Sequence, residues 1–152
     1  MNVFDEFYRI VADFRSEGIN YALVGGVAVA FHTQPRFTKD IDLLVRPADL
    51  DCIQRTLHNN GYFQSALPWT FKGSALTLHR FLKVENEDEM VIDILVAGDR
   101  DSMRIIDNAI EARSEKWGTI KVAGKKDLIR LKHKRNSKQD QADIERLMDE
   151  KP

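Results

Sequence analysis

The sequence predicts an α+β protein in which a mixed β-sheet has helices packed on one side. Two observations favour this class: helical and extended segments do not alternate regularly, and several later strands follow one another across short turns. A doubly wound parallel sheet would require regular alternation of strands and helices. The chain has 152 residues, of which 43% are hydrophobic, so we expect one domain with its own core over residues 1–152.

The first 60 residues are expected to form three helices and two strands. Apolar residues at steps of three and four predict the first helix, because this spacing gives a helix one apolar face. Gly18 can end that helix, since glycine readily adopts the left-handed geometry found there. The expected elements are helices over 2–17, 27–31 and 48–60 and strands over 21–24 and 40–45.

The later part of the chain is expected to hold strands joined by short turns and then two closing helices. The polar run ENEDE predicts a turn between two of these strands. Strands are expected over 62–65, 74–85 and 90–96 with an edge strand over 119–122, and helices over 102–113, 126–135 and 138–149. The core motifs thus fall within 21–96 and the C-terminal helices within 125–149.

Composition and charge exclude several classes of protein. The net charge of −1 gives no global field that would attract nucleic acid or a membrane. The single cysteine, Cys52, excludes an internal disulfide and fits a reducing compartment. The N-terminus lacks the pattern of a signal peptide, and no apolar run approaches the length of a membrane span. We therefore expect a cytoplasmic protein without a membrane partner.

Three aspartates interrupt apolar strands, where an ionised carboxylate is costly unless it is paired or binds a metal. Asp40 and Asp42 alternate along one predicted strand, so both project from one face about 6 to 7 Å apart. Asp93 lies in the middle of MVIDILV, another strand. If the two strands pair, three carboxylates converge, and hard cations such as Mg²⁺ would relieve their repulsion.

A pair of glycines, Gly25-Gly26, lies where a predicted strand ends and a helix begins. The absence of side chains lets backbone N–H groups approach a triphosphate, and a helix N-terminus favours negative charge. A Gly-Gly pair by itself is usually only a turn, and an Asp-x-Asp at a strand edge is often merely solvated. Their order together with Asp93 favours a metal and nucleotide site.

The arrangement GG, thirteen residues, DID and a later VIDIL resembles the nucleotidyltransferase fold of the DNA polymerase β superfamily. The span VGGVAVAFHTQPRFTKDIDLLV looks like the small bacterial branch related to abortive-infection and toxin–antitoxin toxins, the AbiEii-like group. The closing stretch DLIRLKHKRNSKQDQADIERL is similar to the C-terminal helices of that branch. The resemblance covers most of the chain, from about Tyr21 to Leu147.

The resemblance implies a role for each residue of the pattern. Gly25 and Gly26 would hold the triphosphate, and Asp40 and Asp42 would bind Mg²⁺, or Mn²⁺ in its place. Asp93 would complete a second metal site and act as the base that takes the acceptor's hydroxyl proton. Many relatives have serine at the second glycine position, so one hydroxyl contact is missing here or comes from another residue, for which Thr38 is the candidate.

Residues 121–138 contain eight Lys or Arg against one acid, Asp127. Such a run is commonly a solvated basic face of a helix. The alternative is that Lys132 and Arg135 reach nucleotide phosphates or a polyanionic acceptor. Asp140 and Asp143 would order these two side chains or simply supply charge at a helix start. Arg36, in the loop before the aspartates, is either an exposed side chain or a phosphate contact.

The expected function is a Mg²⁺-dependent enzyme that transfers an NMP group from an NTP to a hydroxyl and releases pyrophosphate. The acceptor is open between tRNA, a protein and a small molecule, and it would bind across a homodimer or bring its own surface. A toxin–antitoxin or abortive-infection role, with a cognate antitoxin, is one option. The alternative is a non-catalytic relative that acts as an interaction partner. Trp69, in LPWTFKG, is expected to pack in the core or at its rim rather than to stack on a base, and the alternative is a place near an open cleft.

Overall fold

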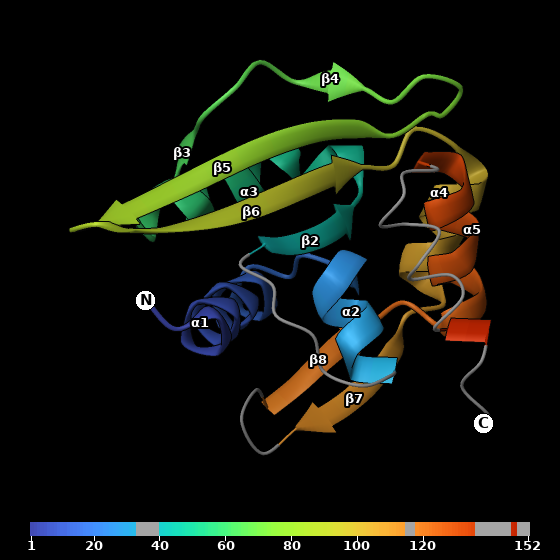
Figure 1. Cartoon of the computed structure of the whole chain (residues 1–152), viewed down its shortest axis with the longest axis horizontal. Helices are drawn as coiled ribbons and strands as arrows, with labels where there is room; N and C mark the ends of the chain where they lie inside the picture. The colour runs from blue at the N-terminus through green and yellow to red at the C-terminus, as the bar shows by residue number, and fades with distance from the viewer. Residues whose placement is uncertain (33–39, 115–117, 136–146, 149–152) are drawn as a thin grey trace.

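A mixed sheet of eight strands is the framework of this protein (Figure 1). The structure is a computed structural model that describes residues 1–32, 40–114, 118–135 and 147–148. The strands are β1 (Tyr21–Val24), β2 (Asp40–Val45), β3 (Phe63–Gln64), β4 (Trp69–Thr70), β5 (Thr77–Glu85), β6 (Asp88–Val96), β7 (Ile110–Ser114) and β8 (Gly118–Val122). The helices are α1 (Val3–Ser16), α2 (Gly25–His32), α3 (Leu50–Asn59), α4 (Arg100–Asp107) and α5 (Lys125–Arg135), with a 3-10 turn at Pro47–Asp49.

The strand order is β3-β5-β6-β2-β1-β8-β7, and β4 also pairs with β5. β2 runs parallel to β6 and β1 parallel to β8, whereas the other pairs are antiparallel. Parallel and antiparallel pairs in one sheet with separate helices confirm the predicted α+β class. No helix among the described residues has both the length and the apolar character needed to cross a bilayer.

The first helix forms where the apolar spacing predicts it. The side chain of Asn2 accepts hydrogen bonds from the backbone N–H groups of Phe4 and Asp5, which would otherwise lack partners at the helix start. The apolar face of α1 is buried, including Phe7 and Phe14. Burial of this face against the sheet, rather than helix propensity, supplies most of the stability of such a helix.

The β5–β6 hairpin is the longest antiparallel pair of the sheet. Its two-residue turn places Asn86 at a φ of 55°, a left-handed conformation that asparagine tolerates well. Pairing of Glu85 with Asp88 fixes the register along the hairpin, so that Arg80 lies opposite Asp93. In Figure 1, α3 lies behind β5 and β6, and no helix of the described residues crosses the front of β5.

Two sequence predictions for the later part of the chain are wrong. The helix predicted over 102–113 ends at Asp107, and Ile110–Ser114 is instead strand β7, because pairing along β8 overrides the local helical spacing. The strand predicted over 119–122 is β8, which lies between β1 and β7 and is not an edge. Most of the helix predicted over 138–149 lies outside the described residues.

Smaller differences concern where elements begin. α2 starts at Gly25 rather than at Val27, and β5 starts at Thr77 rather than at Ser74. The short strand β4 was not expected, and β3 is limited to two residues. These boundaries depend on pairing and turn geometry, which local sequence patterns define poorly.

A buried ion pair joins α1 to β5 on the side of the sheet that α1 covers. The Lys83 ammonium donates to Glu6 Oε1 at 3.0 Å, and the Tyr62 hydroxyl donates to Glu6 Oε2 at 2.8 Å. The side chains of Glu6 and Lys83 are 5% and 10% exposed, so neither charge has water as an alternative partner. Burial and the Glu6 carboxylate raise the pKa of Tyr62, which therefore stays a donor.

We expect removal of one charge from this pair to destabilise the protein more than removal of both. Glu6→Leu leaves the Lys83 ammonium buried without its carboxylate, which costs about 3 kcal/mol in the free energy of unfolding. The double variant Glu6→Leu/Lys83→Met should lose clearly less than the single variant. Urea denaturation measures the free energy of unfolding of the unsubstituted protein, the single variant and the double variant. A single variant as stable as the double would show that the pair does not act as a unit.

Candidate active site

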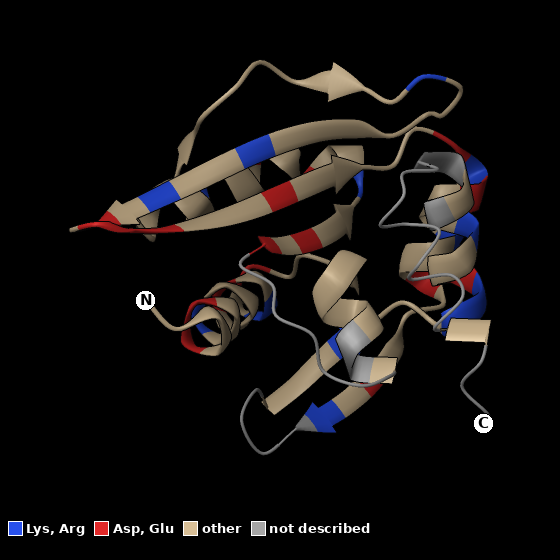
Figure 2. Cartoon of the chain, viewed as in Figure 1, with Lys and Arg blue, Asp and Glu red and all other residues tan. Residues whose placement is uncertain are grey.

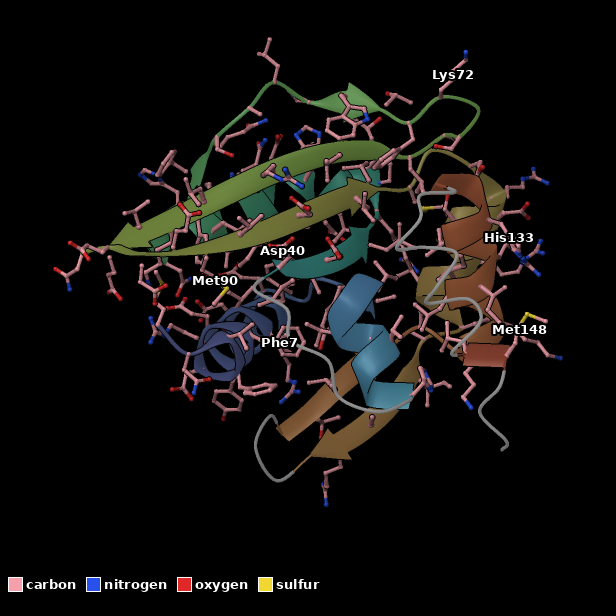
Figure 3. The ribbon with its side chains drawn as sticks, in the orientation of Figure 1. Phe7, Asp40, Lys72, Met90, His133 and Met148 are labelled. Atoms are coloured by element: carbon pink, nitrogen blue, oxygen red, sulfur yellow. The ribbon has the colours of Figure 1, made fainter. Side chains whose placement is uncertain are left out.

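The parallel pairing of β2 with β6 brings two carboxylates side by side. Asp42 lies directly opposite Asp93, so their side chains project from the same face of strands about 4.8 Å apart. Asp40, two residues earlier, projects from the same face at the start of β2, alongside β6 (Figure 3). Asp40 is exposed, Asp42 half-buried and Asp93 buried. Figure 2 shows these acidic positions on β2 and β6 next to a basic position on β5.

Arg80 on β5 supplies the cation next to this row. Its Nε donates to Asp93 Oδ1 at 2.8 Å and an Nη donates to Oδ2 at 2.9 Å, which is the bidentate geometry that guanidinium and carboxylate favour. The hydrogen bond to Asp93 raises the pKa of Arg80, and the charges of Asp93, Asp40 and Asp42 act in the same direction. Arg80 therefore lies in the field of all three aspartates.

Gly25 is required by the position of Asp42. It directly follows Val24, which pairs with Asp42, and its φ of +72° is one that other residues rarely adopt. A Cβ atom at Gly25 would lie 1.8 Å from Oδ2 of Asp42, well inside van der Waals contact. The glycine thus brings the backbone at the start of α2 directly against the carboxylate, and the N-terminus of a helix favours negative charge.

The other predicted residues fall in different parts of the chain. Gly26 is the second residue of α2, so the Gly-Gly pair opens this helix as expected. Lys132 and Arg135 belong to α5, which packs against α2, although their side chains lie outside the described part of the structure. Thr38, Arg36, Asp140 and Asp143 also lie outside the described residues.

The donor set can be compared with what Mg²⁺ requires. Within the described ranges, no three His, Cys, Asp or Glu side chains lie close enough to hold an ion by themselves. Mg²⁺ usually binds through one or two carboxylates together with waters and substrate phosphates, rather than in an all-protein cage. Asp40 and Asp42 supply such carboxylates beside a turn suited to phosphate, so the residues fit an ion that arrives with a nucleotide.

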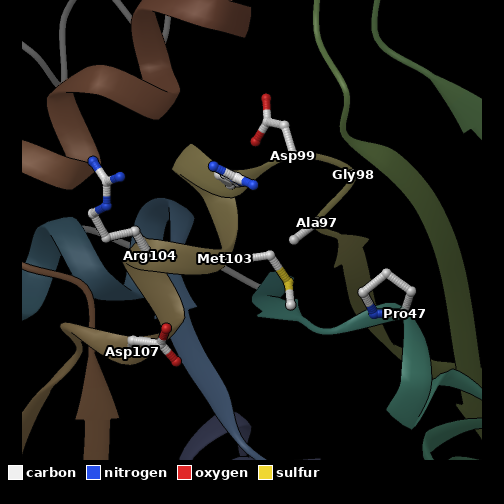
Figure 4. Close-up of a pocket in the computed structure, with 8 residues that line it drawn as sticks. Pro47, Ala97, Gly98, Asp99, Met103, Arg104 and Asp107 are labelled. Atoms are coloured by element: carbon white, nitrogen blue, oxygen red, sulfur yellow. The ribbon is translucent and has the colours of Figure 1, made fainter.

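A pocket of about 630 Å³ lies apart from these residues, where β2 and β6 end (Figure 4). Met103 of α4 points between Ala97 and Pro47 in this pocket. The carboxylate of Asp99 caps α4, accepting from the N–H of Ser102 at 2.8 Å, so it is already engaged in holding the helix. None of the predicted site residues lines the pocket.

The fold is shared with several solved nucleotidyltransferases. The lincosamide antibiotic adenylyltransferase LnuA, solved with lincomycin, matches at a TM-score of 0.61 and 18% identity over 95% of this chain and 96% of LnuA. ANT(2″)-Ia, in complex with adenylyl-2″-tobramycin, matches at 0.61 and 11% identity over 95% and 86%. A Thermotoga maritima protein described as a nucleotidyltransferase matches at 0.60 and 12% identity over 98% and 92%. These likenesses define a nucleotidyltransferase fold.

The sequence also identifies the family. The model of the aminoglycoside-2″-adenylyltransferase family matches residues 6–101, a stretch that includes the glycine pair and all three aspartates, and the chain belongs to this family. No curated protein matches the chain in a sequence search. The predicted nucleotidyltransferase superfamily is thus confirmed, while membership in the AbiEii-like branch stays a prediction.

Arg80 is the residue of this site that the sequence patterns did not single out. Its strand, TLHRFLKVE, alternates between faces, and an arginine there is easily taken for an ordinary solvated side chain. The turn predicted within ENEDE is the sequence feature that could identify Arg80. If Asn86 and Glu87 are the two turn residues, the register of the hairpin pairs Arg80 with Asp93.

Gly25→Ala should be more destabilising than the same change at another glycine of equal backbone conformation. Gly18 has a φ of +71° and open space where a Cβ would lie, so Gly18→Ala measures backbone strain alone, about 1 kcal/mol. Gly25→Ala adds the collision with Asp42 and should cost at least about 1 kcal/mol more. Equal losses in urea denaturation would contradict the close approach of Gly25 to Asp42.

Arg80→Met removes a positive charge from the aspartate row, and we expect it to strengthen the binding of a divalent cation without nucleotide. An increase of about tenfold in Mn²⁺ affinity corresponds to about 1.4 kcal/mol, which is reasonable for one half-exposed charge. Calorimetric titration with MnCl₂ measures it, and Arg80→Lys, which keeps the charge, is the control. Unchanged or weaker binding in Arg80→Met would show that Arg80 does not oppose the cation.

Proposed function

We propose that this protein is a Mg²⁺-dependent nucleotidyltransferase that transfers an NMP group from an NTP to a hydroxyl of a small molecule. The observation that carries the proposal is the row of carboxylates on β2 and β6, next to the glycine turn that opens α2. Mg²⁺, or Mn²⁺, would shield the phosphates and polarise the α-phosphoryl group when it is bound. Membership in an adenylyltransferase family supports ATP as the donor.

Each residue would act through position and charge. Asp40 and Asp42 would hold the metal with the nucleotide, and the N–H groups of Gly25 and Gly26 would bind the triphosphate at the start of α2. Lys132, Arg135 and Thr38 are proposed as further phosphate contacts, on the strength of the family resemblance. Closeness of Gly25 to Asp42 supports this arrangement, because phosphate and carboxylate would share the metal between them.

Asp93 is proposed as the base that takes the proton of the acceptor hydroxyl. Arg80 now donates to both of its oxygens and favours the charged carboxylate, so weakening of this ion pair would make Asp93 a better proton acceptor. The Arg80 side chain is 44% exposed, whereas that of Asp93 is 8% exposed, so Arg80 can turn away without disturbing the core. The α-phosphoryl group of an incoming nucleotide, which would lie over the aspartates between the glycines and β5, offers Arg80 an alternative anionic partner. Release of Asp93 as the nucleotide binds would couple proton acceptance to substrate. Asp93 is also the proposed ligand of a second metal.

The family favours a small-molecule acceptor over tRNA or a protein. Its name refers to adenylylation of an aminoglycoside, and LnuA and ANT(2″)-Ia were solved with antibiotic ligands. A toxin–antitoxin or abortive-infection role, with a homodimer or a cognate antitoxin as partner, is the second form of the proposal. It rests only on the AbiEii-like resemblance, which residues 24–45 and the closing stretch 127–147 carry.

One observation favours a second candidate function, that of a non-catalytic relative. Arg80 forms an ion pair with Asp93, the residue proposed as the base. In a domain that binds no metal, such an ion pair would neutralise the buried carboxylate. Such a domain would bind a partner or a nucleotide without turnover. Three aspartates kept on one face favour the enzyme, because without a cation they would repel one another.

Asp42→Asn should abolish transfer and leave the fold intact. The change keeps the size of the side chain but removes a charge that would hold the metal, so we expect loss of at least about a thousandfold in transfer of labelled AMP. Among the NTPs, each tested with Mg²⁺, ATP should raise the melting temperature of the unsubstituted protein and not that of Asp42→Asn. Asp51→Asn, an exposed aspartate on α3, is the control and should behave as the unsubstituted protein.

The two candidate functions give different results in this experiment. A nucleotide-dependent melting shift with no transfer to any acceptor in cell extract would favour the non-catalytic relative. Absence of a metal-dependent shift with every NTP would contradict both the enzyme and the metal site.

A further inference from the structure

The segment over 63–71, which holds β3, β4 and their connection, presents large apolar side chains to solvent. We refer to it as the aromatic arm. Phe63 is 51% exposed, Trp69 50% and Leu67 90%. Three such side chains within seven residues form a local exposed apolar group, and exposed apolar groups of this kind commonly mark binding surfaces.

The aromatic arm lies on the same face of the sheet as the aspartates. Trp69 pairs with Leu78 and Phe63 with Leu82, and in each pair the two side chains share a face. Leu78 and Leu82 are two residues on either side of Arg80, so they project from the face on which Arg80 holds Asp93. The backbone N–H of Ser65 donates to the carbonyl of Arg80 at 3.0 Å, which fixes the arm next to this residue.

Trp69 is held in place although half of it is exposed. Its ring packs edge-to-face against Phe71, with centroids 5.2 Å apart and planes at 68°. The hydroxyls of Thr70 and Thr77 hydrogen-bond across the strands at 3.1 Å, and the Phe71 N–H donates to the carbonyl of Leu76. A fixed aromatic ring loses little entropy when it binds a second ring.

The strand order places the arm opposite the glycine turn. Across the sheet the order runs from β1, which ends at the glycines, through β2 and β6 with the aspartates, to β5 and the arm (Figure 1). In-line phosphoryl transfer requires the attacking hydroxyl on the side opposite the leaving pyrophosphate. If the triphosphate lies at the glycines, as the proposed function states, the acceptor comes from the side of the arm.

The charges around the arm restrict which acceptor it suits. Residues 61–79 contain no Asp or Glu, and their only Lys or Arg is Lys72, in the loop between β4 and β5 (Figure 3). Burial lowers the pKa of His79, which disfavours its charged form. Arg80 comes next along β5. On this segment a ligand with several ammonium groups would therefore meet positive charge and no carboxylate. The neighbouring carboxylates of Asp40, Asp42 and Asp93 would already be engaged by the metal, by Arg80 and by the acceptor hydroxyl.

We propose that the aromatic arm is the acceptor subsite, and that the acceptor is a hydroxyl compound with a sugar or other ring that stacks on Trp69 and with few positive charges. The hydroxyl oxygen of this compound forms a bond to the α-phosphorus of the NTP. The bond from that phosphorus to the bridging oxygen breaks, pyrophosphate leaves with the electron pair, and the hydroxyl proton passes to Asp93. This inference rests on the proposed function and narrows its acceptor class, away from polycationic aminoglycosides.

Fluorescence of Trp69 tests the subsite directly. The chain has two tryptophans, so Trp117→Phe leaves Trp69 as the reporter. With Mg²⁺ and a non-hydrolysable ATP analogue present, the probes are lincomycin, which has a single basic amine, and tobramycin, which has several. We expect a saturable change with lincomycin and binding of tobramycin weaker by about tenfold or more. No response to lincomycin up to millimolar concentration, or equal binding of tobramycin, overturns the proposal.

Substitutions separate the subsite from a merely structural role. In the unsubstituted background, Trp69→Ala should raise the KM for lincomycin about tenfold, the factor expected for one lost stacking contact, while Trp69→Phe restores most of it. Tyr8→Ala removes an equally exposed aromatic side chain from α1 and should change nothing. An unchanged KM in Trp69→Ala overturns the proposal, as does a dimer that Trp69→Ala dissociates without affecting lincomycin binding.

The melting shift with Mg²⁺ and ATP distinguishes failure of the subsite from failure of the proposed function. The shift should be the same in Trp69→Ala as in the unsubstituted protein, because the arm lies away from the triphosphate. A shift that persists while Trp69 does not respond to lincomycin overturns only the acceptor subsite. Loss of the shift in the unsubstituted protein overturns the proposed function together with the subsite.

Discussion

The in-register parallel pairing of β2 with β6 is the constraint on which the rest of the site depends. It fixes Asp42 beside Asp93 at the spacing of neighbouring strands, where two negative charges repel strongly in a partly dry environment. The residues next to Asp42 and Asp93 accommodate these two carboxylates. Gly25 follows β1 at a position where a Cβ atom would collide with Asp42, and Arg80 on β5 lies opposite Asp93. A shift of one residue along β2 would move Asp42 to the other face, which would separate it from Asp93 and remove the reason for the glycine.

We expect the site to have two states, which differ in the anion that Arg80 binds. Without ligand, Arg80 binds Asp93 and its field extends over Asp40 and Asp42. With a nucleotide and its metal, positive charge arrives at the aspartates and negative charge arrives for Arg80, so the same guanidinium can exchange one anion for another. Such an exchange needs no movement of the sheet, because Arg80 is the one partner of this pair that reaches solvent.

Much of this arrangement could be predicted from local patterns. The limits of β1 and β2, the helix α1 and the positions of the glycines at a strand-to-helix junction all follow from short-range spacing. Arg80 could not be recognised in this way, because its role depends on the register of a hairpin and thus on where one turn lies. The local spacing of β7 predicts helix, whereas its strand conformation depends on pairing with β8, which the pattern of residues 102–113 does not contain. The exposure of Trp69 likewise depends on how a two-residue strand pairs with β5, and its own sequence, LPWTFKG, gives no sign of the pairing.

The central claim is that Asp40 and Asp42 hold a divalent cation together with a nucleotide bound at the start of α2. Anomalous scattering from a crystal grown with Mn²⁺ and a non-hydrolysable ATP analogue tests it most directly. The account predicts a peak within coordination distance of carboxylate oxygens of Asp40 and Asp42, with the phosphates against Gly25 and Gly26. A bound nucleotide whose ion lies away from both aspartates, or whose phosphates lie away from α2, would contradict it.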